Sequence, residues 1–130
     1  QIKLLKELKI SYEVKSNLSN EQVVELYLSC DILSFVSHYE GFGMPVLEAQ
    51  AVGTPVMASD ISAIREVAGE SVLYADPFDV HSIRDSIVQM IQSSSLRKEL
   101  ISKGLKNVEQ YRAKNIAEKY MNLYNLLLNE

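Results

Sequence analysis

The sequence has one cysteine, no long apolar run and no excess of basic residues, and each shortage excludes a class of protein. A single thiol, Cys30, cannot form an internal disulfide or a multi-thiolate metal site, and its apolar helical context favours a buried, inert side chain. No apolar run approaches the roughly 18 residues that a membrane span requires, and the first ten residues do not form a signal-peptide core. The net charge of -4 argues against a nucleic-acid surface. A cytoplasmic globular domain is therefore expected.

What the sequence does contain fits one ordinary domain. Its 130 residues are 47% hydrophobic and 23% charged, which is average for a globular protein and argues against disorder. A chain of this length buries a sizeable core. It begins at Gln1 without an initiator methionine, from which we expect a piece of a longer protein, truncated on its N-terminal side.

Helical and strand patterns alternate along the chain. A helical start around Ile2–Lys9 is followed by a β-favouring stretch at Tyr12–Lys15, and Ser19 with Gln22 forms a capping box that predicts a second helix. The predicted remainder is a strand at 32–36, a helix from Pro45 to Gly53, a strand at 55–58, a polar loop at 59–62, a strand at 72–74 and three closing helices.

This order predicts the fold class and the place of the site. Strands joined through helices imply right-handed crossovers, and hence a Rossmann-like open parallel sheet with helices on both faces, as a single α/β domain. Ligands of such sheets bind at the carboxyl ends of the strands. The loop after Val36 is therefore expected to be functional.

That loop, from Ser37 to Glu48, places two carboxylates eight positions apart around two glycines and a helix start. Glycines let the backbone approach a ligand and adopt positive φ. A helix beginning near Pro45 presents unpaired N–H groups and a positive dipole end to a diphosphate. Glu48, expected in the first turn, suits a vicinal diol such as a ribose, and Glu40 suits the hydroxyls of a second ring.

The residue pattern also admits a purely structural interpretation. Gly43 and Pro45 occur as ordinary loop and helix-start residues, and a glutamate in a first turn is favoured by the helix dipole alone. Several other residues are expected to be structural or solvent-exposed rather than catalytic. These are His38, Arg65 on a strand-end loop, His81 on the surface, and three tyrosines expected to pack against the sheet, Tyr111, Tyr120 and Tyr124.

The stretch from Glu40 to Ala49, EGFGMPVLEA, resembles nearly letter for letter the E-x7-E signature of the family-4 retaining glycosyltransferases. The resemblance continues through the capped helix and strand at 19–37, GTPVMAS at 53–59, IREV at 64–67 and LYADP at 73–77. It covers roughly residues 14 to 128. It departs from the family at Tyr12–Lys15, which lacks the glycine that usually follows, and at Ala113, where many relatives carry Trp.

The resemblance implies that residues 1–130 are the nucleotide-sugar-binding C-terminal domain of a two-domain GT-B enzyme. By resemblance, Glu40 is the catalytic residue that contacts the transferred sugar, and Glu48 holds the ribose. The implied donor-binding set is Glu40, Gly41, Phe42, Gly43, Met44, Val46, Leu47 and Glu48. Pro45 has no N–H to contribute.

The implied reaction is retaining transfer of a hexosyl group from a nucleotide-diphosphate sugar to a glycan or lipid-linked acceptor, without a metal or other cofactor. The basic pair that neutralises the diphosphate and the acceptor-binding N-terminal domain are both absent from this chain, so the chain alone is expected to be inactive. Peripheral membrane association of the full-length protein is compatible with such acceptors. Two alternatives stay open: a non-catalytic nucleotide-binding or interaction module, and one half of a GT-B-type sugar epimerase.

Overall fold

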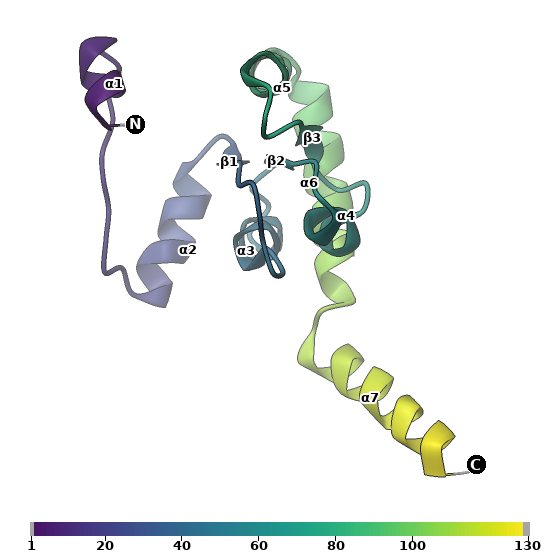
Figure 1. Ribbon diagram of the computed structural model, residues 1–130. Coiled ribbons are helices and arrows are strands. Elements are labelled where there is room, and N and C mark those ends of the chain that lie inside the picture. The colour runs from purple at the N-terminus through teal and green to yellow at the C-terminus, as the bar shows by residue number, and fades with distance from the viewer. Residues whose placement is uncertain (1, 129–130) are drawn as a thin grey trace.

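The computed structural model describes residues 2–128 and contains one parallel sheet of three short strands, in the order β1-β2-β3. The strands are β1 (Leu33–Phe35), β2 (Val56–Ser59) and β3 (Leu73–Ala75). In register, Leu33 pairs with Val56 and Met57 pairs with Leu73. Spatial order follows chain order, because each helical crossover returns the chain to the next position in the sheet (Figure 1).

Helices cover both faces of this sheet, as predicted. In Figure 1, α3 (Met44–Ala51) and α4 (Ser62–Ala68) lie below the strands, α5 (Val80–Gln92) lies above them, and α6 (Ser94–Glu109) passes along the side. The remaining helices are α1 (Ile2–Glu7), α2 (Asn20–Ser29) and α7 (Ala113–Leu128).

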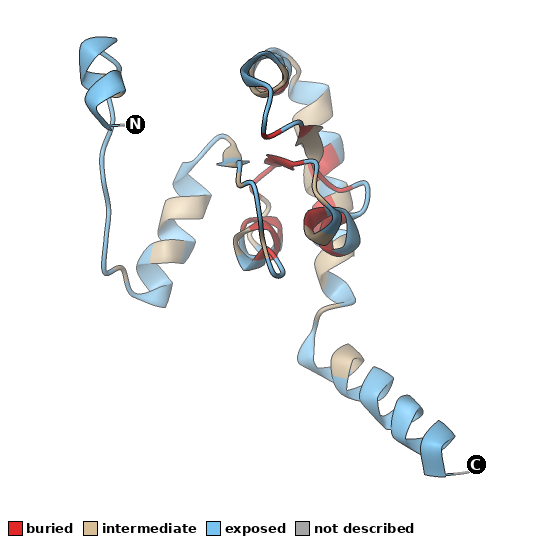
Figure 2. Ribbon diagram, in the orientation of Figure 1, coloured by how far each residue is buried: buried red, intermediate tan, exposed pale blue. Residues whose placement is uncertain are grey.

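The two faces of β2 carry two halves of the core. Val56 and Ala58 pack with α3 and α4, whereas Met57 packs with α5 and α6. All four residues of the strand are buried, because alternate side chains point to faces that are both covered (Figure 2). The strand predicted at 55–58 is thus confirmed as the central strand, whereas β1 at the edge of the sheet is only partly buried.

A polar network fastens α6 to α3. The buried Gln50 donates from Nε2 to Ser71 Oγ at 2.7 Å and accepts from Asn107 Nδ2 at 2.9 Å. The same Asn107 nitrogen donates to the Val67 carbonyl oxygen at 3.0 Å. The helices approach closely at Gly104, where an added Cβ would lie 2.9 Å from Cγ of Gln50. The network therefore fixes α3, whose first turns follow the predicted functional loop.

The predicted helix signals are borne out by the local geometry. Ser19 caps α2, and the reciprocal capping box with Gln22 is formed. Pro45 lies in the first turn of α3, and Gly53, just after that helix, has a φ of 80°. These signals are local, so no tertiary contact was needed to predict them.

Three local expectations are wrong. Tyr12–Lys15 forms no strand, because this exposed segment connects α1 to α2 away from the sheet and has no neighbouring strand to supply hydrogen bonds (Figure 1). Arg65, expected on a strand-end loop, lies in helix α4, and this helix forms because Ile64, Val67 and Ala68 pack into the core. Cys30 is exposed at the C-terminal end of α2, a helix without a buried residue.

The two ends of the described chain extend away from the core. Both α1 and α7 have no buried residue, and α7 projects beyond the body (Figure 2). Tyr120 and Tyr124 therefore do not pack against the sheet, contrary to expectation, and each is 54% exposed. Tyr111, before α7, is half-buried and donates to the Val67 carbonyl oxygen at 3.1 Å. Within residues 2–128, no helix is long and apolar enough to cross a membrane.

Candidate functional site

The carboxyl ends of the three strands are tied together by side chains from their loops. The Ser37 N–H donates to Ser59 Oγ at 2.8 Å, which joins the ends of β1 and β2. Nε2 of His38 lies 3.2 Å from the Pro77 carbonyl oxygen, and the His38 ring stacks on Phe78 with centroids 4.6 Å apart. A carbonyl only accepts, so this contact uses a protonated Nε2. These contacts hold the start of the loop after β1 in place, and His38 has a structural role in them.

Gly43 is required by the turn between this loop and α3. It is buried, it has a φ of 94°, and it occupies the N-cap position, where it offers no capping side chain. An added Cβ would lie 2.5 Å from Cδ1 of Ile64 on α4. Backbone conformation and packing therefore both demand glycine, which supports the structural interpretation of this residue.

Gly41 is different, because nothing in the described chain requires it. It does not have a positive φ, no atom lies within 4 Å of an added Cβ, and the residue is exposed. It also makes no hydrogen bond with any described residue. The expected positive φ is therefore found at Gly43 and not at Gly41. The backbone N–H and C=O groups of Gly41 are therefore exposed and make no hydrogen bond within the described chain.

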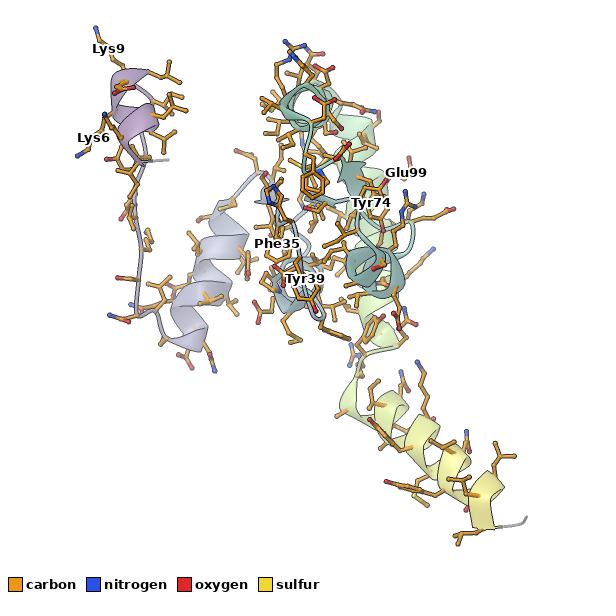
Figure 3. All side chains as sticks on the ribbon, viewed as in Figure 1. Lys6, Lys9, Phe35, Tyr39, Tyr74 and Glu99 are labelled. Atoms are coloured by element: carbon orange, nitrogen blue, oxygen red, sulfur yellow. The ribbon has the colours of Figure 1, made fainter. Side chains whose placement is uncertain are left out.

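Glu40, immediately before Gly41, is half-buried and has no hydrogen-bonding or ionic partner among residues 2–128. The side chain of the next residue after Gly41, Phe42, is 42% exposed and meets the Tyr111 ring edge-on, with centroids 5.9 Å apart. In Figure 3, Phe35 marks the end of β1 and Tyr39 marks the loop that leads down from it. The loop thus places the unpaired carboxylate of Glu40 next to the unpaired backbone N–H and C=O groups of Gly41.

Glu48 lies on the exposed side of α3. It is the fifth residue of the helix, so it follows the first turn and does not lie within it, as the sequence had suggested. Its Oε2 accepts a hydrogen bond from the Tyr27 hydroxyl at 3.1 Å. Burial raises the pKa of Tyr27 to about 12, and the hydrogen bond to Glu48 contributes in the same direction. The phenol therefore remains a donor to this carboxylate at neutral pH.

Two grooves meet at Glu48. The larger, of about 490 Å³, lies between α3 and the end of α6, and the smaller, of about 340 Å³, lies between α2 and α3. Of the predicted donor-binding residues, the larger groove is lined by Met44, Leu47 and Glu48. Glu40 and Gly41 line neither of these two grooves. The structure thus gathers the α3 residues in one groove and leaves the Glu40 end of the loop outside it.

The backbone amides expected to face a diphosphate are not all equivalent. The Val46 N–H donates to the Gly43 carbonyl oxygen at 3.0 Å, and the Val46 side chain is fully buried in the core. Leu47 is also buried except where it reaches the larger groove. The amides of the loop before α3 are consequently better candidates than that of Val46.

Sequence reasoning missed Tyr27 and Arg112. Tyr27 lies in the helix predicted after Ser19, and the available signal was a tyrosine in that helix, because a partly buried phenol ordinarily needs a hydrogen-bond partner. Arg112 lines the larger groove and is ion-paired with Glu109. Arg65, expected on a loop, is exposed on α4, pairs with Asp60 and lies over the Tyr74 ring. His81 is exposed, as expected.

No cluster of three or more His, Cys, Asp or Glu side chains that could hold a metal ion is found among residues 2–128. The loop after β1 and the start of α3 offer carboxylates, backbone amides and an adjoining apolar groove. Such groups bind hydroxyls and anions at the carboxyl edge of a parallel sheet.

A three-layered α/β domain with a glycine loop and a helix start at this edge belongs to the open parallel-sheet architectures, in which ligand sites lie at the carboxyl ends of the strands. Comparison with known proteins identifies the family. The family model described as glycosyl transferases group 1 matches residues 2–107, and the chain belongs to this family. The O-antigen chain mannosyltransferase B of Escherichia coli is 37% identical over 108 residues, which are 83% of this chain and 28% of that protein.

Solved structures show the same fold. The sucrose-phosphate synthase of Thermosynechococcus elongatus superposes with a TM-score of 0.84 at 23% identity, over 98% of this chain and 33% of its own. The C-terminal domain of a glycosyl transferase group 1 protein from Francisella tularensis superposes with a TM-score of 0.72 at 24% identity, over 84% of this chain and 58% of its own. The fold is that of GT-B glycosyltransferases, as expected. The chain spans about a third or less of the length of the curated relatives that it matches.

Proposed function

We propose that this chain is the donor-binding domain of a retaining glycosyltransferase, which transfers a hexosyl group from a nucleotide-diphosphate sugar to a glycan or lipid-linked acceptor. The observation that carries the proposal is the pair Glu40 and Gly41. A half-buried carboxylate without a partner is followed by a glycine whose backbone is free and whose surroundings are open. The described chain explains neither feature, whereas a bound sugar with hydroxyls near the loop explains both.

The proposed roles of the site residues are those that the family resemblance implies. Glu40 accepts hydrogen bonds from hydroxyls of the transferred sugar, and Glu48 accepts them from the ribose. The amides of Phe42, Gly43 and Met44, with the positive end of the α3 dipole, face the diphosphate. The resemblance also assigns Val46 and Leu47 to this set, and their contribution is through the packed first turn of α3. Met44, Leu47 and the larger groove supply the apolar wall beside Glu48.

The catalytic contribution proposed for this domain is positioning and stabilisation of the nucleoside-diphosphate leaving group. No metal is required by this proposal. A basic pair and an acceptor-binding domain, both outside these residues, complete the site, so this chain alone is expected to bind donor weakly and to transfer nothing. The E. coli relative is named an O-antigen chain mannosyltransferase, which supports a hexosyl donor and a polysaccharide product.

The test is an amide-resolved NMR titration of the 130-residue chain with uridine diphosphate and guanosine diphosphate. This method detects weak binding and locates it. We expect at least one nucleotide to shift the amides between Glu40 and Glu48, and Glu48→Ala to weaken that binding. Glu66→Ala on α4, an exposed glutamate outside the proposed site, is the matched control and should leave the titration unchanged.

The alternatives predict other results. Shifts absent with both nucleotides would contradict the donor-site proposal and favour an interaction module. Nucleotide binding that survives Glu40→Gln and Glu48→Ala unchanged would mean that the carboxylates have no part in the site, as the structural interpretation holds.

A further inference from the structure

The carboxylate of Glu48 on α3 is hydrogen-bonded to the hydroxyl of Tyr27 on α2. The Tyr27 hydroxyl donates to Oε2 at 3.1 Å across 21 positions of sequence. The other oxygen, Oε1, accepts no hydrogen bond from residues 2–128. An ionised carboxylate offers about four acceptor positions, so one bond from a phenol leaves it able to accept two more.

Tyr27 is itself held in place. Its carbonyl oxygen accepts from Thr54 Oγ1 at 2.8 Å and from the Cys30 N–H at 3.1 Å. Thr54 is buried at the start of the segment that leads into β2, and the Tyr27 ring packs against the core formed with α3 and β2. The phenol is therefore fixed to the same rigid body as the sheet.

We propose that Tyr27 is a positioning residue for Glu48, and that it orients this carboxylate so that the site selects a ribose over a deoxyribose. The inference rests on the proposed function, because it assumes that Glu48 binds the sugar of the nucleotide. An exposed glutamate on a helix surface otherwise samples several rotamers, and a fixed donor at one oxygen removes most of that freedom.

The ionisation of the pair agrees with this role. Burial, and then the hydrogen bond to Glu48, raise the pKa of Tyr27 to about 12, so the phenol keeps its proton throughout the physiological range. Tyr27 therefore acts only as a donor here, and Glu48 only as an acceptor. A ribose hydroxyl that donates to the remaining carboxylate positions completes the arrangement, whereas a deoxyribose leaves one of them without a donor.

The experiment compares Tyr27→Phe with the unchanged chain by the same NMR titration. The probes are uridine and guanosine diphosphates and their 2′-deoxy forms. We expect Tyr27→Phe to raise the Kd of the ribonucleotide about fivefold to tenfold, and that of the deoxyribonucleotide less than about twofold. Tyr27→Phe combined with Glu48→Gln should bind no more weakly than Glu48→Gln alone.

Tyr74→Phe is the matched control, because its hydroxyl donates to the Gly69 carbonyl oxygen, away from the site. It should change neither Kd. If Tyr27→Phe weakens ribose and deoxyribose nucleotides equally, its role is merely structural and the inference is wrong. It is also wrong if Glu48→Gln weakens ribonucleotide binding and Tyr27→Phe does not, an outcome that leaves the proposed function intact.

A second measurement needs no change at Tyr27. In Glu48→Gln the ζ-carbon resonance of Tyr27 should move, because the phenol loses its charged acceptor, and an unmoved resonance would show that the two groups do not interact. If the unchanged chain binds neither nucleotide, the proposed function fails first and this inference fails with it.

Discussion

Replacing Gly43 by alanine tests the turn that sets the start of α3. Two costs add at this residue. A non-glycine residue at a φ of 94° is strained by about 1–3 kcal/mol. The new Cβ would also lie 2.5 Å from Cδ1 of Ile64, which is fully buried and cannot move into solvent, and such overpacking costs about 1–3 kcal/mol. We expect Gly43→Ala to lower the free energy of unfolding by about 2–6 kcal/mol.

Urea denaturation followed by circular dichroism measures this loss, and two further variants separate its causes. Ile64→Val removes the obstructing Cδ1, at a cost of about 0.5–1.5 kcal/mol by itself. The double variant should then be less destabilised than the sum of the single ones by about 1–3 kcal/mol. Gly41→Ala, where an added Cβ meets nothing within 4 Å, should change stability by less than about 0.5 kcal/mol.

The stability measurements on these variants can also refute the reasoning. A loss below about 1 kcal/mol for Gly43→Ala, or strict additivity with Ile64→Val, would mean that neither strain nor the contact with Ile64 demands glycine. For Gly41→Ala, nucleotide binding is measured in addition to stability. If it keeps full stability and loses nucleotide binding, the exposed backbone of Gly41 is used by a ligand. If it loses neither, the site proposal is weakened at its central residue.

Three further predictions concern the elements around the site. The pKa of Tyr27, raised to about 12 from 10.0 mainly by burial, should fall in Glu48→Gln yet stay above 10.0 in an NMR titration, and a fully normal pKa would contradict the burial of the phenol. Because the pKa is higher in the folded state, the stability contributed by the protonated phenol is present below pH 10.0 and is lost as pH rises towards 12. Asn107→Ala should cost about 1–3 kcal/mol in urea denaturation, because it leaves Gln50 Oε1 without its donor, and a neutral effect would show that water replaces it. Ser19→Ala should cost about 0.5–2 kcal/mol through loss of the α2 cap, with increased amide exchange in the first turn as the distinguishing sign; unchanged exchange would deny the capping box a role.

The sequence alone determined the elements whose signals are local. Ser19 and Gln22 predict the start of α2, Pro45 and Gly53 bracket α3, and the apolar runs at 32–36 and 55–58 predict parallel strands. The family resemblance followed from an uninterrupted motif, which does not depend on tertiary structure. The expected position of the candidate site at the carboxyl edge followed from topology, because helices between parallel strands fix which edge carries the loops.

Only the tertiary structure decided the features that depend on partners distant in sequence. The segment 12–15 has strand propensity and forms no strand because it has no neighbour to pair with, and residues 62–68 become a helix because Ile64 and Val67 find a core to enter. Gly41 and Gly43 look alike in the sequence, and only the positive φ of Gly43 and its contact with Ile64 distinguish them. Tyr27 and Glu48 lie 21 positions apart, so their hydrogen bond exists only once α2 packs beside α3.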